Sequence, residues 1–131
     1  MGIGLNVGNW VGDHSILRAR RCLFAHNGAA GLFGICERGH GIDVALDHCT
    51  VVDNRGSGVG SGDEEHGSGT WRLTRCIVAG NAGDLLKIEA GDVQECFVGG
   101  EPRFRDRAGR DYRLATDSPA RTGDGVLGAL E

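Results

Sequence analysis

The sequence feature that most constrains the fold is a repeat with a period of about 27 residues. Cysteine, asparagine and a bulky apolar residue each recur at this interval: Cys22, Cys49 and Cys76; Asn27, Asn54 and Asn81; Leu5, Leu32, Val59 and Leu86. A fixed period of about 20 to 50 residues is typical of solenoids, in which each repeat buries its apolar face against the next. The repeat therefore predicts a stack of similar units.

Each repeat holds three apolar runs that are too short for helices and that alternate with a period of two residues, as half-buried strands do. The runs of two successive repeats are Leu17/Ala19, Cys22/Phe24 and Leu32, then Val44/Leu46, Cys49/Val51 and Val59. Glycine supplies 24 of the 131 residues, which disfavours helices because each interior Gly costs about 1 kcal/mol there. We expect an all-β fold with glycine at turns such as Gly28, Gly56 and Gly83.

The chain resembles the right-handed parallel β-helix repeat proteins of the pectate-lyase-like superfamily, and specifically their C-terminal portion. The resemblance rests on the asparagine row and on a tail that contains Pro102-Arg-Phe104-Arg-Asp106, Asp111-Tyr-Arg-Leu114, Ser118-Pro-Ala120 and Gly128-Ala-Leu-Glu131. It implies one domain over 1–131, a right-handed single-stranded parallel β-helix (a solenoid). About four rungs of roughly 27 residues would occupy 1–100, and a closing segment over 101–131 would cap the last rung.

The repeated asparagines and cysteines are expected to form structural ladders. By the resemblance, Asn27, Asn54 and Asn81 hydrogen-bond from rung to rung. The fourth rung is expected to be short, because Cys96 follows Cys76 by less than one full period and Glu101 stands where the next asparagine would be. In-register cysteines suit disulfide geometry poorly, so an internal thiol stack is preferred to disulfides: Cys22, Cys49, Cys76 and Cys96.

Three histidines are candidate metal ligands, because they lie in loops at nearly the repeat period. His14, His40 and His66 are evenly spaced, at an interval just short of that period, and have acidic neighbours. Imidazole with carboxylate binds divalent transition metals. The alternative is that polar surface loops simply carry such residues. A metal is possible, no cofactor is required, and bound Zn²⁺ or Ni²⁺ would raise the melting temperature.

The outward positions of the first strand in each repeat form the candidate binding surface. The resemblance implies a groove here, in which Arg18, Asp43 and Arg72, with His14, His40 and His66, would bind a saccharide. Arginine clamps a carboxylate through two hydrogen bonds. Candidate catalytic residues are Arg18, Arg72, Asp43 and Asp47. The alternative is that these are ordinary charges on a solvated sheet.

The expected function is that of a non-catalytic module that binds carbohydrate or serves as a scaffold in an extracellular bacterial protein. The alternative is a polysaccharide lyase or glycoside hydrolase acting on an acidic polysaccharide. The net charge is −4 and no block of basic residues occurs, so no nucleic-acid partner is expected. No apolar run is long enough to insert in a membrane.

The expected location and assembly follow from the same resemblance. It implies a secreted or cell-surface protein, although the chain starts without a signal peptide. The first rung has no evident cap, and its free strand edges predict association of copies through that end.

Overall fold

The computed structural model describes residues 4–9, 14–36, 41–61, 68–89, 92–122 and 125–130, and these contain strands and turns but no α-helix. Twelve strands form three parallel sheets. Sheet A contains β1 (Leu5–Asn9), β4 (Leu32–Cys36), β7 (Ser57–Ser61) and β10 (Gly83–Leu86). Sheet B contains β2 (His14–Arg20), β5 (Gly41–Asp47), β8 (Ser68–Thr74) and β11 (Val93–Gln94). Sheet C contains β3 (Leu23–Ala25), β6 (Thr50–Val52), β9 (Ile77–Ala79) and β12 (Phe97–Val98).

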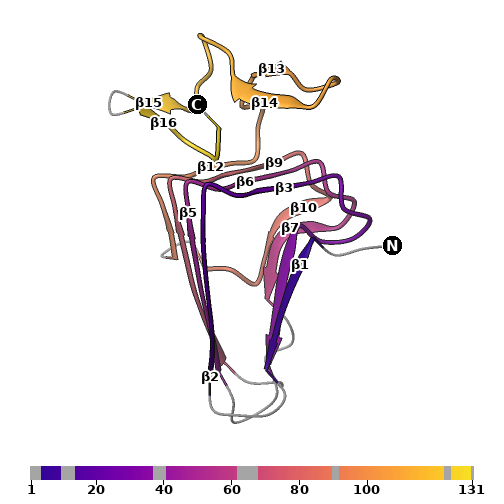
Figure 1. Ribbon diagram of the computed structural model, residues 1–131, viewed down its shortest axis with the longest axis vertical. Coiled ribbons are helices and arrows are strands. Elements are labelled where there is room, and N and C mark those ends of the chain that lie inside the picture. The colour runs from indigo at the N-terminus through magenta and orange to yellow at the C-terminus, as the bar shows by residue number, and fades with distance from the viewer. Residues whose placement is uncertain are drawn as a thin grey trace.

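The chain visits sheets A, B and C in turn, and each new strand lies beside the previous strand of the same sheet (Figure 1). This order is compatible with a β-solenoid. In sheet B, Leu17 lies opposite Val44, and Val44 lies opposite Trp71, a step of one repeat each time. The expectation of an all-β fold with parallel sheets is confirmed.

The sequence interval between residues that lie opposite one another in neighbouring strands is shorter at the last rung. As the cysteine spacing indicates, Phe97 of β12 lies opposite Ile77, a step shorter than one full repeat. In sheet A, however, Leu85 rather than Leu86 lies opposite Val59, so the expected register of Leu86 is wrong. The turn between the repeated asparagine and the strand is one residue shorter here. As a result Leu86 is 42 % exposed, and Leu85 packs against the core instead.

The core fills the space between the three sheets. The inward residues of the second rung are at most 2 % exposed, and so are most of those in the third: Val44, Leu46, Cys49, Val51, Leu73, Cys76 and Val78. The corresponding residues of the first rung, such as Leu17 and Phe24, are only partly buried. Burial is therefore greatest where a rung has a neighbour on both sides.

The repeated glycines mostly allow atoms of the neighbouring rung to approach the backbone closely, rather than allowing unusual backbone angles. A Cβ on Gly58 would lie 2.6 Å from Asn81 Nδ2. Gly28 and Gly56 lie at bends, as expected, whereas Gly83 is the first residue of β10, and none of the three has a positive φ. Positive φ angles of 51 to 53° occur instead at a corner of each rung, at Arg21, His48, Arg75 and Glu95.

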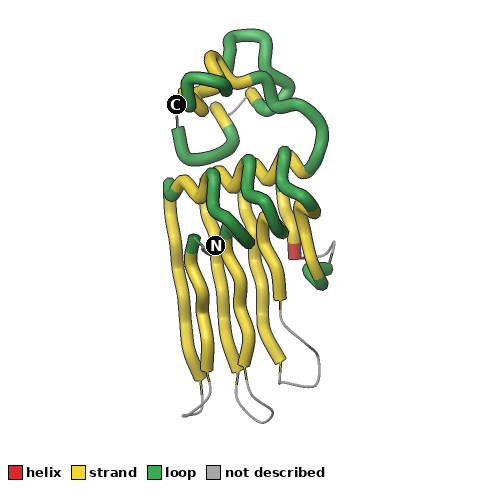
Figure 2. Tube along the Cα trace, turned by 90° about the vertical axis from the view of Figure 1, so that its right-hand side faces the viewer, coloured by secondary structure: helices red, strands yellow, loops and turns green. Residues whose placement is uncertain are grey.

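The C-terminal segment contains two small antiparallel pairs, which are β13 (Phe104–Asp106) with β14 (Asp111–Leu114), and β15 (Arg121–Thr122) with β16 (Gly125–Val126). It lies over the outer face of sheet C (Figures 1 and 2). There Phe104, Tyr112 and Leu114 form an apolar cluster with Val52 and Ile77. None of its described strands pairs with β10, β11 or β12. The segment thus covers the side of the coil rather than the strand edges of the last rung, where the sequence analysis expected a cap.

Candidate functional site

A shallow groove of about 300 Å³ lies on the outer face of sheet B. It crosses three neighbouring strands, β2, β5 and β8, because their outward residues are in register. Ile16, Asp43 and Thr70 form one row across the strands, and Arg18, Ala45 and Arg72 form the next. All six of these residues line the groove. The structure therefore brings together three predicted binding residues, Arg18, Asp43 and Arg72.

Two arginines frame the groove on either side of the small side chain of Ala45. Arg18 and Arg72 are two strands apart, which corresponds to about 10 Å between their backbones. Both are exposed, and neither guanidinium has a hydrogen-bond or ion-pair partner among the described residues. Ile16, at one edge of the groove, is 61 % exposed. The site thus offers two guanidinium groups, one carboxylate and one apolar side chain to a ligand.

Asp47, the fourth predicted catalytic residue, lies outside the groove. Its carboxylate accepts hydrogen bonds from Arg20 Nε at 3.1 Å and from His48 Nδ1 at 2.9 Å. Asp43 and Asp47 are four residues apart on one strand, so their backbones are about 13 Å apart. Retaining and inverting glycosidases place their two carboxyl groups about 5 to 9.5 Å apart. The two residues are therefore not arranged as a glycosidase pair.

The predicted metal ligands fall largely outside the described residues. This holds for His40 and His66, and only the backbone of His14 is described, at the start of β2. Within the described ranges, no three His, Cys, Asp or Glu side chains are grouped in a way that could hold a metal ion.

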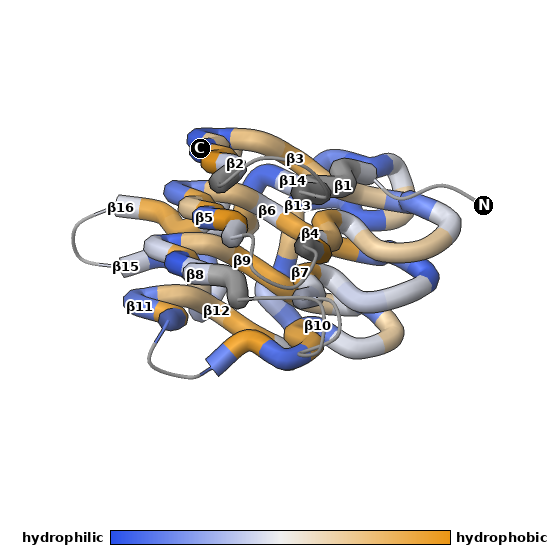
Figure 3. Tube along the Cα trace, turned by 90° about the horizontal axis from the view of Figure 1, so that it is seen from below, coloured by the Kyte–Doolittle hydropathy of each residue, from blue (hydrophilic) through white to orange (hydrophobic). Residues whose placement is uncertain are grey.

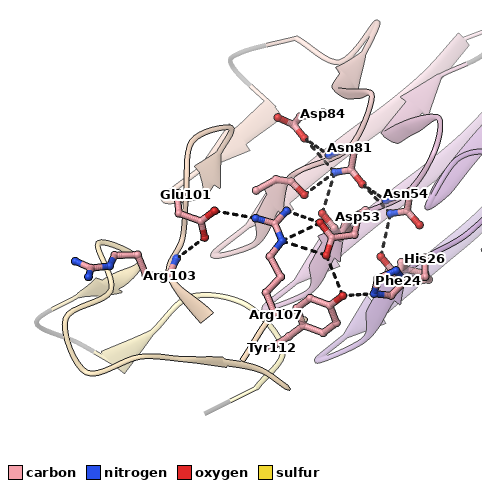
Figure 4. Close-up of polar contacts among 12 residues, drawn as sticks. Phe24, His26, Asp53, Asn54, Asn81, Asp84, Glu101, Arg103, Arg107 and Tyr112 are labelled. Atoms are coloured by element: carbon pink, nitrogen blue, oxygen red, sulfur yellow. Dashed lines mark hydrogen bonds and ion pairs between the residues drawn. The ribbon is translucent and has the colours of Figure 1, made fainter. Parts of the chain in front are cut away.

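The repeated asparagines form a hydrogen-bonded row at the corner between sheets C and A, and Figure 4 shows its part from Asn54 to Asp84. Asn27 Nδ2 donates to Asn54 Oδ1 at 2.8 Å, and Asn54 Nδ2 donates to Asn81 Oδ1 at 2.8 Å. Asn81 Nδ2 donates in turn to Asp84 Oδ1 at 3.0 Å. Asp84, which the sequence analysis missed, thus takes the acceptor role in the last rung. Its position three residues after Asn81 is a local signal that could have identified it.

The cysteines form a second row inside the coil. The Cys49 amide donates to Cys76 Sγ at 3.4 Å, and the Cys76 amide donates to Cys96 Sγ at 3.3 Å. These thiols and that of Cys22 are free. Contact with the Cys49 and Cys96 thiols, together with burial, raises the pKa of Cys76. Cys76 is therefore a neutral, unreactive thiol in the folded protein.

A polar network joins the C-terminal segment to sheet C (Figure 4). Tyr112 donates its hydroxyl hydrogen bond to Asp53 Oδ2 at 2.9 Å and contacts His26 Nε2. Arg107 forms an ion pair with Asp53 and donates to Glu101 at 2.8 Å. The sequence carries no local signal for this network, because Tyr112 lies 59 residues after Asp53, in the C-terminal segment, where the repeat has ended.

The charges of the network stabilise one another. Burial by itself would raise the pKa of Asp53. The hydrogen bonds from Arg107 and Tyr112 outweigh burial, and the pKa of Asp53 is lowered. Burial and the hydrogen bond to Asp53 raise the pKa of Tyr112 to about 12. Asp53 is therefore ionised and Tyr112 protonated at neutral pH, which is the state that these hydrogen bonds require.

Comparisons with known proteins provide no relative: no family model matches the chain, and no curated protein or solved structure is significantly similar to it. The described part of the chain also contains no helix that is both long and apolar enough to cross a membrane.

Proposed function

We propose that the chain is a right-handed parallel β-helix whose sheet B binds carbohydrate and does not cleave it. The order of strands supports the proposed handedness. In each sheet, a strand is followed by two strands in the other sheets before the chain returns to pair in parallel. Crossovers between parallel strands of one sheet are right-handed in about 98 % of cases.

The observation that carries the binding proposal is the pair Arg18 and Arg72 on either side of Ala45. Each guanidinium is a planar fork that donates several hydrogen bonds to hydroxyl or carboxylate oxygens. Ala45 leaves room between them at the backbone. Ile16 adds an apolar surface against which the CH face of a sugar ring can pack. An extended, hydroxyl-rich and acidic saccharide fits this combination best.

The lining of the groove supports binding without catalysis. Among the described residues that line it there is a single carboxylate, that of Asp43, and no His, Tyr or Lys. A guanidinium with a pKa above about 12 is a poor general base at neutral pH. The second candidate, a polysaccharide lyase, is favoured only by the position of Arg18 and Arg72 beside Asp43. In that reaction an arginine in its neutral form would accept the C5 proton next to the uronate carboxylate, while the C4–O glycosidic bond breaks and a C4–C5 double bond forms.

Binding is tested by titrating the protein with oligogalacturonate, oligoalginate and a neutral oligoglucan in a calorimeter. We expect acidic oligosaccharides to bind and Arg18→Gln or Arg72→Gln to weaken binding about tenfold each. Arg55→Gln is the matched control, because Arg55 is an exposed arginine in a turn away from sheet B. Equal affinity for the acidic and neutral oligosaccharides, or equal loss in the control, would refute the proposal.

Catalysis is tested in the same samples. A lyase releases unsaturated uronates, so the absorbance of the sample at short ultraviolet wavelengths rises with time. We expect no rise with pectin, alginate or glycosaminoglycans. A rise that Arg18→Gln or Arg72→Gln abolishes would replace the binding proposal with the lyase.

We also propose that the protein works outside the cell or at its surface, where acidic polysaccharides occur. The burial of Cys49 and Cys76 shields these two free thiols from oxidants and is compatible with this location. Fractionation of the native host into medium, envelope and cytoplasm provides the test. Recovery in the cytoplasm alone would refute the proposed location.

A further inference from the structure

Both ends of the coil leave interior side chains uncovered. In the first rung, Leu17, Ala19, Cys22 and Phe24 are only partly buried, although their counterparts one rung further in are at most 2 % exposed. The last rung shows the same change, since Val98 is 41 % exposed whereas Val78 is fully buried. Each end therefore presents a cross-section of the core that another rung would cover.

The strand edges at the two ends are also unpaired among the described strands. β1, β2 and β3 each pair on one side only, and so do β10, β11 and β12 at the other end (Figure 3). The C-terminal segment lies over the side of sheet C and pairs with none of these edges. Open edges of this kind invite pairing with another parallel strand.

The two ends carry opposite charges. On the first rung the charged side chains described on the outer face and corner of β2 are basic: Arg18, Arg20 and Arg21. On the last rung the charged residues next to β11 are acidic, with Asp92 just before the strand and Glu95 just after it, while Lys87 and Glu89 of the preceding connection carry opposite charges. Two first-rung ends would bring like charges together, as would two last-rung ends. Only a first rung against a last rung is electrostatically complementary.

The register inside the molecule shows how such charges pair across rungs. Arg75 and Glu95 occupy the same corner of successive rungs and form an ion pair at 2.8 Å. Arg20 and Asp47 lie opposite one another in successive rungs and pair at 3.1 Å. Continued by one more rung, the same register would set Glu95 beside the Arg21 corner of a following first rung. Asp92 would likewise lie beside Arg18.

We propose that a second copy of this chain docks its first rung onto the last rung, so that copies stack head to tail and continue all three sheets. The contact is heterologous, because it joins two different surfaces. Repetition of such a contact gives an open chain of copies rather than a closed dimer.

The test is the mass of the whole protein across a wide concentration range, measured by sedimentation velocity. We expect the average mass to rise without a plateau at two copies. Arg21→Glu or Glu95→Arg alone places like charges at the contact and should raise the concentration needed for association about tenfold or more. Arg55→Glu, a charge reversal away from both ends, is the matched control. Circular dichroism confirms that each variant is folded.

Rescue distinguishes the contact from damage to the monomer. Arg21→Glu and Glu95→Arg combined in one chain restore opposite charges at every contact, so association should return. An equimolar mixture of the two single variants should also associate, because each supplies the end that the other needs. A monomer at all concentrations would overturn the proposal. So would a plateau at two copies, or failure of both the double variant and the mixture to associate.

Discussion

Replacement of Asn54 by leucine tests the energetic role of the asparagine row. Asn54 is 3 % exposed, and its side chain makes four hydrogen bonds that leucine cannot make. Its Oδ1 accepts from the Asn27 amide at 3.0 Å and from Asn27 Nδ2 at 2.8 Å. Its Nδ2 donates to Asn81 Oδ1 at 2.8 Å and to the Phe24 carbonyl at 3.1 Å.

The expected loss follows from the groups that remain without a partner. Asn81 Oδ1 keeps a hydrogen bond from the Asn54 amide at 3.0 Å, so it is not orphaned. The two donors of Asn27 lose their partner, whereas the carbonyl of Phe24 keeps the ladder hydrogen bond that the register of β3 and β6 gives it from the Val52 amide. Each orphaned buried group costs about 1 to 3 kcal/mol, and Asn27 is half exposed and partly rehydrated. We therefore expect Asn54→Leu to lower the free energy of unfolding by about 2 to 4 kcal/mol.

The assay is urea denaturation at neutral pH, followed by circular dichroism. Asn27→Leu is the matched control, since it makes the same chemical change at the half-buried end of the row. It removes only one of the two donors of Asn54 Oδ1, because the backbone amide of residue 27 still donates to that oxygen, so a loss of about 1 kcal/mol or less is expected. A loss under about 1 kcal/mol for Asn54→Leu, or equal losses for both variants, would refute the reasoning.

Three further results are expected. Gly58→Ala should destabilise the protein, because its Cβ would lie 2.6 Å from an asparagine side chain, whereas Gly83→Ala meets nothing within 4 Å and should change the urea midpoint little. Because the folded pKa of Asp53 is lowered, its stabilising contribution is complete above the unfolded value of 3.8 and is lost as the pH falls through the folded pKa. The wild type should therefore lose more stability than Asp53→Asn between neutral and acidic pH, in urea titrations. Aromatic disulfide reagents should modify Cys96, whose pKa is lowered by contact with the Cys76 thiol, before Cys76, as peptide mass spectrometry would show.

Much of the coil was predictable because residues that contact one another in stacked rungs are separated by the same number of residues in the sequence each time. Residues that face one another, such as Leu17 and Val44, recur at the repeat period, and alternation within the strand separates inward from outward positions. Arg18, Asp43 and Arg72 could therefore be placed on one face before the structure was known.

Features that the repeat period does not determine could not be predicted in this way. Leu85 and Leu86 are equally apolar, so their pattern did not show which of them faces inward. The length of the preceding turn decides that choice, and Asp84 accepts hydrogen bonds within it. Asp47 pairs with Arg20 through side-chain conformations that spacing does not encode. The C-terminal segment docks through Tyr112 and Asp53, which no period connects.

The position of the C-terminal segment has a consequence for how the protein unfolds. In a simple solenoid each repeat contacts only its neighbours, so end repeats can fray while the middle stays folded. Here Tyr112 contacts His26 on the first rung and Asp53 on the second, while the Gly128 amide donates to the Arg75 carbonyl, which lies on the third rung, at 2.8 Å. One segment thus couples rungs that are not adjacent. This coupling favours a single cooperative unfolding transition over stepwise loss of the first rung.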